Sequence, residues 1–247
     1  MKDIIEVSNV SKSYGGVKAN VDISMVVKKG SITGIIGPNG CGKTTLFNSI
    51  VGFHPIDKGS IQFDGKEISK LLVGDIARLG LLRTFQQTRI YSKMNCVDNM
   101  QISVSRRKDA QYGLFASRKG EIKEKAEHLL DFVGLYSKRN LISGDLSFGQ
   151  QKLLEFAMAL MNEPKVLLLD EPTAGINPTL INGLIDRLRK ANDELGITLC
   201  VIEHNMRVIM NLASDIYCLS NGKMLASGKP KDLQNNPKVI DAYLGGH

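Results

Sequence analysis

Residues 37–45 read Gly-Pro-Asn-Gly-Cys-Gly-Lys-Thr-Thr and carry the strongest chemical signal in the sequence. They fit the pattern Gly-x-x-x-x-Gly-Lys-Thr, follow the apolar run 32–36, and precede a helical pattern over residues 46–50, which is the context of a phosphate-binding loop. Glycines let successive backbone N–H groups point at one phosphate, and the helix start adds its positive dipole end. We expect nucleotide phosphates to bind at Gly37, Pro38, Asn39, Gly40, Cys41, Gly42, Lys43, Thr44 and Thr45.

Polar side chains follow three further strand patterns. The apolar residues 166–169 lead into Asp170 and Glu171, residues 198–203 lead into His204, and residues 81–85 lead into Gln86. Carboxyl ends of parallel strands lie at the edge of the sheet where ligands bind. Asp170, Gln86 and the Thr44 hydroxyl could therefore surround Mg²⁺, Glu171 could polarise a water in line with the γ-phosphate, and His204 could donate to that phosphate. Each of these residues alone is weak evidence, since a solvated Asp-Glu pair or a structural Gln or His is common.

Residues 146–150, Leu-Ser-Phe-Gly-Gln, combine a hydroxyl, a glycine and a helix start. This combination predicts a second phosphate-binding element, with Ser147, Gly149 and Gln150 as its ligating residues. It stands at the tip of a predicted helical insertion, so one chain does not easily bring it to its own phosphate loop. Two chains arranged head to tail could complete each other's sites, which predicts an isologous dimer with two sandwiched nucleotides.

The pattern of elements predicts an α/β fold. Strand patterns occupy residues 4–7, 21–27, 32–36, 60–63, 81–85, 166–170, 198–203, 216–220 and 224–227, and helical patterns occupy 68–78, 97–105, 121–133, 151–161, 181–195, 205–212 and 237–244. Residues 11–16 read as a loop that carries Tyr14, and Asp64-Gly65 and Asn221-Gly222 read as tight turns. Strand patterns are missing between about 88 and 160. We therefore expect one domain over 1–247, with a core at about 1–86 and 162–247 and a helical subdomain at about 87–161.

Composition limits the class of protein. The 247 residues are 43 % hydrophobic and 23 % charged, as in ordinary soluble domains. The sequence shows neither an apolar run of the roughly 20 residues that a membrane span needs nor a signal-peptide core, which predicts a cytosolic chain. Four scattered cysteines without a C-x-x-C pair argue against a zinc site or a disulfide framework.

The net charge is +7, but the basic residues are spread along the sequence. Their only dense cluster, Arg106-Arg107-Lys108, is interpreted as a solvated loop rather than an anion site. We expect no nucleic-acid partner.

Taken together and in order, Tyr14, residues 37–45, Gln86, residues 146–150, residues 166–171, Asn177 and His204 resemble the ATP-binding cassette (ABC) ATPase domain over essentially the whole chain. The resemblance implies a P-loop NTPase of ABC type, with a mixed sheet core, an N-terminal antiparallel β subdomain and an inserted helical subdomain. It implies ATP and Mg²⁺ as cofactors, with Tyr14 under the adenine, Thr44, Gln86 and Asp170 around Mg²⁺, and Glu171, His204 and Gln86 in catalysis. Asn177 falls in the loop that joins the two sites of the dimer.

Several shorter strings resemble ATPases that import branched-chain and other hydrophobic amino acids, among them Arg83-Thr84-Phe85-Gln86-Gln87 and the ending Ala242-Tyr243-Leu244-Gly245. This resemblance implies a second ABC ATPase chain, identical or paralogous, and integral-membrane permease subunits as partners, with a substrate-binding protein as an indirect one. It also implies a place on the cytoplasmic face of the cell membrane. Cys41 departs from the usual Ser, and alkylation there could block the site; Phe148 stands where the wider family often has Gly.

Other functions remain open at this point. A lipopolysaccharide or lipid exporter, a urea importer and an iron–sulfur assembly ATPase share the motifs. A DNA-repair ATPase of this fold would need a long coiled coil before residue 146, and the sequence shows no heptad repeat there. A GTPase would need an Asn-Lys-x-Asp guanine reader, which the sequence lacks.

Overall fold

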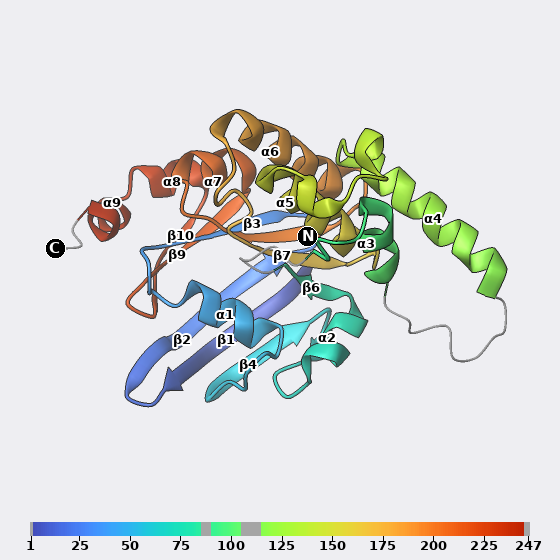
Figure 1. The fold of residues 1–247 in the computed structure, drawn as a ribbon. Helices are drawn as coiled ribbons and strands as arrows, with labels where there is room; N and C mark the ends of the chain where they lie inside the picture. The colour runs from blue at the N-terminus through green and yellow to red at the C-terminus, as the bar shows by residue number, and fades with distance from the viewer. Residues whose placement is uncertain (1, 85–89, 105–114, 245–247) are drawn as a thin grey trace. The chain divides into compact units, whose positions relative to one another are not determined.

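A computed structural model describes residues 2–84, 90–104 and 115–244 of the chain (Figure 1). The chain divides into two compact units, and each is described by itself. The core unit comprises Met1–Arg83, Lys165–Pro172 and Leu188–His247, and the helical unit comprises Thr84–Pro164 and Thr173–Arg187. Gln86 and the cluster Arg106-Arg107-Lys108 lie outside the described residues.

The core unit holds two sheets. The first is antiparallel, with the strand order β2-β1-β4-β5, and the second is mixed, with the order β10-β9-β3-β8-β7-β6. The strands are β1 (Asp3–Tyr14), β2 (Val17–Lys28), β3 (Ile32–Ile36), β4 (Lys58–Phe63), β5 (Lys66–Glu67), β6 (Leu81–Arg83), β7 (Val166–Asp170), β8 (Thr198–Ile202), β9 (Asp215–Ser220) and β10 (Lys223–Gly228). An N-terminal antiparallel sheet beside a mixed sheet with helices confirms the predicted fold class.

The mixed sheet explains the unbroken apolar runs of the sequence. Every residue of β3, β7 and β8 is buried, as expected for central parallel strands covered on both faces. Strand β3 pairs in parallel with β8 and β9, and β7 pairs in parallel with β6 and β8. The carboxyl ends of these five strands therefore share one edge of the sheet.

Helix α1 (Lys43–Ile50) joins the two sheets into one apolar core. Its Leu46, Phe47 and Ile50 are buried in the same cluster as Ile23 of β2 and Ile35 of β3. The other helices that lie wholly within this unit are α2 (Val73–Leu79), α7 (Met206–Leu212), α8 (Pro230–Gln234) and α9 (Pro237–Leu244), of which the last three follow one another along the C-terminal part of the chain (Figure 1).

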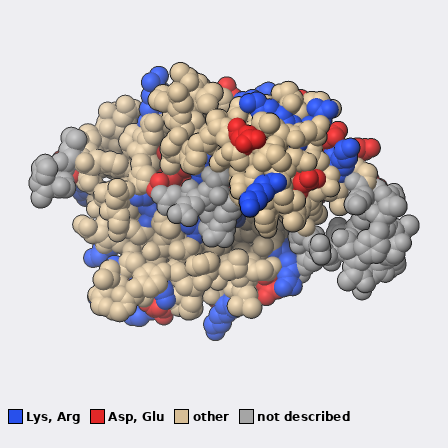
Figure 2. Space-filling model, in the orientation of Figure 1, with Lys and Arg blue, Asp and Glu red and all other residues tan. Residues whose placement is uncertain are grey.

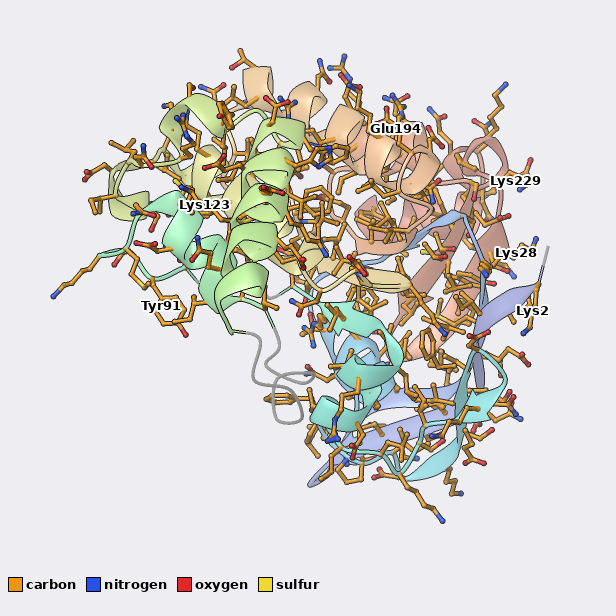
Figure 3. All side chains as sticks on the ribbon, turned by 90° about the vertical axis from the view of Figure 1, so that its right-hand side faces the viewer. Lys2, Lys28, Tyr91, Lys123, Glu194 and Lys229 are labelled. Carbon is orange, nitrogen blue, oxygen red and sulfur yellow. The ribbon has the colours of Figure 1, made fainter. Side chains whose placement is uncertain are left out.

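The helical unit contains α3 (Cys96–Ile102), α4 (Phe115–Phe132), α5 (Phe148–Leu160) and short 3-10 turns at Tyr136–Lys138 and Ser143–Asp145. Helices α3, α4 and α5 pack against one another. Helix α6 (Pro178–Asp193) begins in this unit and ends in the core unit. Lys123 on α4 and Tyr91 before α3 extend from this unit (Figure 3).

Some expected elements are wrong in extent. The loop expected at residues 11–16 is a continuation of β1 to Tyr14, followed by a tight turn at Gly15, because backbone pairing with β2 extends to Tyr14↔Val17. The helix expected at 68–78 begins only at Val73, since Ile68 is buried and its N–H donates to the carbonyl of Ile61 in β4. Helix α4 begins at Phe115, inside the loop expected at 106–119.

Two tight turns were predicted correctly. Asp64-Gly65 has φ values of 51° and 79°, and Asn221-Gly222 has 49° and 75°, as a two-residue hairpin turn requires.

The β1–β2 hairpin ends where Lys2 and Lys28 lie side by side (Figure 3), and the Lys29 N–H donates to the Lys2 carbonyl at 2.9 Å.

Basic and acidic side chains are interspersed on the face shown in Figure 2. Among the described residues, none of the helices combines the length and the apolar character needed to span a bilayer.

Candidate functional site

The phosphate-binding loop lies between β3 and α1, as the sequence predicts. Gly37, Gly40 and Gly42 have φ values of 146°, 76° and 102°. A side chain at Gly37 would meet the Leu219 carbonyl oxygen at 2.1 Å, and one at Gly42 would meet the Ala19 carbonyl oxygen at 2.2 Å. Both positions therefore need glycine for space as well as for backbone conformation. Pro38 is half-buried, while Asn39 and Gly40 are exposed at the tip.

Lys43 folds back over the loop. Its Nζ donates to the carbonyl oxygens of Gly37 at 2.8 Å and Pro38 at 3.0 Å, and lies 3.8 Å from Cys41 Sγ. Lys43 is 5 % exposed, and the two carbonyl oxygens replace the hydrogen bonds to water that its ammonium group loses on burial. The following Thr44 is exposed, and Thr45 is half-buried. The loop thus concentrates a positive charge and a helix N-terminus at one place.

Neighbouring segments brace the loop from outside. The Asn20 side-chain amide donates to the Gly42 carbonyl at 3.1 Å. The Gly222 N–H, from the turn between β9 and β10, donates to the Cys41 carbonyl at 3.1 Å, and the Val21 N–H donates to the Gly222 carbonyl at 2.8 Å. These bonds tie the loop to both sheets of the core unit.

Cys41 is buried within the loop. It is 3 % exposed, and burial, its largest influence, raises the pKa of the thiol while the nearby Lys43 lowers it. The thiol therefore stays protonated at neutral pH and reacts slowly, because the thiolate is the reactive form. If alkylation at Cys41 blocks the site, as the sequence predicts, we expect the block to develop slowly.

Asp170 ends β7 and is 1 % exposed. Its Oδ2 accepts from Arg83 Nη2 at 2.6 Å, and the Arg83 guanidinium also contacts Asn48 Oδ1 and lies over the Phe47 ring, 5.7 Å from its centroid. Asp170 Oδ1 is buried without a hydrogen-bond partner among the described residues. The carboxylate thus has a partner for Oδ2 and, among the described residues, none for the buried Oδ1.

Glu171 and His204 meet at the same edge of the sheet. Glu171 Oε1 and His204 Nε2 are in hydrogen-bond contact, and Glu171 has a left-handed backbone with φ 51°. The Glu171 N–H donates to the Ile202 carbonyl at 2.9 Å, which fixes the residue to the end of β8. The buried Glu203 carboxylate accepts from the N–H groups of His204 at 3.1 Å and Asn205 at 3.3 Å. The structure therefore brings together Glu171 and His204, which the sequence predicted separately.

Tyr14 ends β1 and is 46 % exposed, which leaves aromatic surface for a stacked base. Its ring meets the edge of the His54 ring at a centroid distance of 5.4 Å and an angle of 87°. Lys12 Nζ lies 5.3 Å from the Tyr14 ring centroid and 3.1 Å from Asp57 Oδ1. These neighbours hold the ring in position.

The helical unit contains the second phosphate-binding candidate at the start of α5. Ser147 is the N-cap, with its Oγ accepting from the Gln150 N–H at 3.4 Å, while Gln150 Oε1 accepts from the Ser147 N–H at 3.1 Å. This capping box gives Gln150 a structural task beside its expected ligating one. Gly149 is buried close to Ile176 and Leu180.

Asn177 stands immediately before α6. Its Oδ1 accepts from the Thr179 N–H at 3.1 Å and from Thr179 Oγ1 at 2.9 Å. The side chain therefore supports the first turn of the helix, and its expected place between the two sites of a dimer stays a prediction.

The side-chain oxygen atoms at this site are of the kind that binds Mg²⁺. Hard oxygen ligands suit this ion, and Mg²⁺ commonly uses one or two protein groups together with substrate phosphates. The buried Asp170 Oδ1, which has no hydrogen-bond partner among the described residues, would suit such a role, and so would the exposed Thr44 hydroxyl at the start of α1.

The sequence reasoning gave no role to Arg83, the counter-charge of Asp170. The sequence carries no direct signal for this pair, because it depends on the register of β6 with β7, in which Arg83 pairs with Leu168, two residues before Asp170. The hydrogen bond from the Gly37 N–H to the Tyr243 hydroxyl at 2.7 Å was also missed, because nothing in local periodicity indicates which residue a C-terminal helix reaches.

Comparisons with known proteins bear on the whole chain. Residues 21–174 match the family model described as ABC transporter, and residues 223–247 match that described as branched-chain amino acid ATP-binding cassette transporter. The probable branched-chain amino acid transport ATP-binding protein LivG of Archaeoglobus fulgidus is 38 % identical over 246 residues, covering 98 % of this chain and 95 % of the relative. The high-affinity branched-chain amino acid transport ATP-binding protein BraF of Pseudomonas aeruginosa is 38 % identical, covering 99 % and 98 %.

Solved structures give the same picture. A crystal structure of the ADP conformation of an ATP-binding cassette of an ABC transporter has a TM-score of 0.88 and 33 % identity, with 99 % of this chain and 100 % of that one covered. A dimeric cassette in a post-hydrolysis state, bound to ADP and Pi, has a TM-score of 0.78 and 25 % identity, with 92 % and 99 % covered.

Proposed function

The chain belongs to the ABC transporter family, and we propose that it is the ATP-hydrolysing subunit of an importer for branched-chain amino acids. The observation that carries the ATPase is the single sheet edge at which the phosphate loop, Asp170 and the Glu171–His204 pair are found. The amino-acid substrate is supported by the names of the relatives and by the C-terminal match at residues 223–247.

Residues 37–45 hold the phosphates of ATP in this proposal, and Tyr14 stacks on the adenine. Glu171 accepts the proton of the water that attacks the γ-phosphate, and His204, in contact with Glu171, orients that carboxylate and donates to a γ-phosphate oxygen. Asp170, Thr44 and Gln86 would hold Mg²⁺, which neutralises charge on the phosphates when bound. Lys43 leaves the Gly37 and Pro38 carbonyls to reach the outer phosphates.

The working unit is a dimer with two shared sites. A dimeric cassette bound to ADP and Pi among the similar structures supports this assembly. In it Ser147, Gly149 and Gln150 of one chain bind the γ-phosphate held by Lys43 of the other, and Asn177 lies where the two sites communicate. ATP binding closes the dimer, and hydrolysis reopens it.

The membrane partners follow from the transport function. We propose that the helical subdomain, expected at about 87–161, contacts integral-membrane permease subunits on the cytoplasmic face of the cell membrane. A substrate-binding protein would deliver the amino acid to the permease. The lipid-export, urea-import and iron–sulfur alternatives find no support in the relatives named above.

Glu171→Gln tests the proposal. The variant should hydrolyse ATP about 100-fold to 10,000-fold more slowly than the wild type, because a general base contributes a factor of that size. It should also elute as a dimer in gel filtration with ATP and as a monomer with ADP. Glu67→Gln changes an exposed glutamate of β5 in the same way and serves as the control.

A monomer in ATP for the Glu171→Gln protein would contradict the shared site. The substrate is tested in cells: deleting the gene should abolish high-affinity leucine uptake, and the wild-type gene, but not the Glu171→Gln gene, should restore it. Unchanged leucine uptake in the deletion strain would contradict the importer.

A further inference from the structure

The C-terminal helix α9 reaches the phosphate-binding loop through one side chain. Tyr243, in its last turn, accepts a hydrogen bond on its hydroxyl oxygen from the Gly37 N–H at 2.7 Å. Gly37 is the first residue of the loop, and Tyr243 belongs to the ending Ala242-Tyr243-Leu244-Gly245, to which the proposed chemistry gives no part. The two residues are 206 positions apart in the sequence.

The Gly37 N–H has a need for this partner. The parallel pairing of β3 with β9 ends at Ile36↔Cys218, so Gly37 follows the last pair of the ladder. Gly37 is buried, and a buried backbone N–H without an acceptor costs free energy. The Tyr243 hydroxyl supplies that acceptor where the sheet no longer does.

The other side of the same residue is bound to Lys43. The Gly37 carbonyl accepts from Lys43 Nζ at 2.8 Å. The Gly37 backbone is thus held by Tyr243 at its N–H and by Lys43 at its carbonyl. A shift of Tyr243 would move a backbone segment that positions the lysine assigned to the outer phosphates.

Helix α9 has its own means of docking. Val239 is 2 % exposed and Leu233 of α8 is 1 % exposed, and α9 packs against α8 and β10. Asn236 caps the helix, with its Oδ1 accepting from the Lys238 N–H at 3.0 Å. Helix α9 therefore packs in the core unit through contacts other than Tyr243, and these contacts place Tyr243 next to the loop.

We propose that Tyr243 is a positioning residue that couples the docking of α9 to nucleotide binding, so that each stabilises the other. The inference rests on the proposed function, because it assumes that residues 37–45 bind a nucleotide. When Lys43 leaves the Gly37 carbonyl for the phosphates, the Tyr243 hydroxyl remains as the hydrogen-bond partner that holds Gly37 in place, so docked α9 favours the nucleotide-bound loop. By thermodynamic linkage, docked α9 raises nucleotide affinity by the same factor.

The state of the phenol is compatible with this role. Burial, its largest influence, raises the pKa of Tyr243 to about 12, although the bond from Gly37 lowers it. The phenol is therefore neutral at physiological pH and acts by hydrogen bonding rather than by charge.

The test uses the full chain with Tyr243→Phe, and Tyr217→Phe as a matched control. The Tyr217 hydroxyl also makes hydrogen bonds to the backbone, accepting from the Val26 N–H at 3.2 Å and donating to the Val26 carbonyl at 3.1 Å. Its partner Val26 lies on β2 and not in the phosphate-binding loop. Calorimetric titration with ATP and Mg²⁺ should show a dissociation constant about threefold to tenfold higher for Tyr243→Phe, the range of one hydrogen bond. Tyr217→Phe should match the wild type.

Hydrogen exchange provides a readout that a purely structural role would not move. Nucleotide should slow hydrogen exchange of the α9 backbone amides in the wild type and in Tyr217→Phe. In Tyr243→Phe most of this slowing should disappear. Val239→Ala, which loosens the seat of α9, should weaken ATP binding in the wild type but add no further loss to Tyr243→Phe.

The outcomes separate the two levels of the argument. If the wild type binds ATP and Tyr243→Phe binds it equally well, with α9 protection unchanged by nucleotide, the coupling is overturned and the ATPase stands. If the wild type binds no ATP, the proposed function itself fails. Weaker binding by Tyr243→Phe would also overturn the coupling if nucleotide gave α9 of the wild type no protection from exchange.

Discussion

The ion pair between Arg83 and Asp170 permits a quantitative prediction about stability. The side chains are 6 % and 1 % exposed, and the nitrogen–oxygen distance is 2.6 Å. At an effective dielectric constant of 20 this distance corresponds to a direct attraction of about 6 kcal/mol, which the desolvation of both groups largely offsets. Removing one partner leaves the other charge buried, at a cost of about 3–5 kcal/mol.

The perturbation is Arg83→Met, which keeps an unbranched apolar side chain and removes the guanidinium and its charge. For a chain of this size each kcal/mol lowers the melting temperature by about 2–4 °C, so the variant should melt about 6–20 °C below the wild type. Adding Asp170→Asn should recover part of this loss, because the carboxylate then no longer needs a counter-charge. Differential scanning calorimetry without nucleotide measures both variants.

Arg78→Met is the control. Arg78 pairs with Asp75 on α2 at the same 2.6 Å, but the side chains are 44 % and 42 % exposed, so the loss should stay below about 1 kcal/mol. If Arg83→Met melts within the range of this control, or if Asp170→Asn deepens the loss additively, the burial argument is refuted. ATP with Mg²⁺ should stabilise Arg83→Met more than the wild type, because the bound ion would supply the missing positive charge.

Three further predictions concern the nucleotide site. Because burial raises the pKa of Cys41 above its ordinary value of 9.0, iodoacetamide labelling of this thiol, followed by mass spectrometry, should be slow at pH 7.5, accelerate above pH 9 and fall when ATP is added; fast labelling at pH 7.5 would contradict the buried thiol. Gly42→Ala should abolish ATP binding in calorimetry, because a side chain there would lie 2.2 Å from the Ala19 carbonyl oxygen, and wild-type affinity would refute the tight approach. Tyr14→Ala should raise the dissociation constant for ATP about fivefold to 100-fold, while Tyr14→Phe keeps the stacking and should change it little; equal losses in both would argue against stacking.

The sequence identified those parts of the fold that depend on local chemistry. The glycines and lysine of residues 37–45 and the turn residues Asp64-Gly65 are legible because backbone conformation leaves few alternatives. The apolar strand ending at Asp170 is legible because central parallel strands are apolar along their whole length. The convergence of β3, β7 and β8 then followed from the rule that parallel strands share a carboxyl edge.

Other features depended on contacts between distant segments. Strand β1 continues to Tyr14 although Ser11, Lys12 and Ser13 are polar, because β2 pairs with it throughout. Residues 68–72 are not helical although their pattern suggests it, because Ile68 is held by β4. Tertiary pairing overrides local propensity in both places.

The candidate site shows the same division. Residue types at strand ends predicted Glu171 and His204, but their direct contact depends on how far β7 and β8 extend beside each other. The pairing of Arg83 with Asp170 depends likewise on the register of β6 with β7. The capping box that engages Gln150 has the Ser-x-x-Gln spacing of Ser147 and Gln150, so the sequence contains its signal.

The turn at Asn221-Gly222 has a consequence for protein engineering. Hairpin tips usually accept inserted tags and extra residues, since they face solvent and touch little else. Here Gly222 exchanges backbone hydrogen bonds with Cys41 and Val21, and a side chain on it would meet the Ala19 carbonyl oxygen at 2.9 Å. Lengthening this tip by even one residue would withdraw support from the phosphate-binding loop, so an epitope tag or fluorescent reporter belongs elsewhere, for example at the exposed residues 194–196 between α6 and β8.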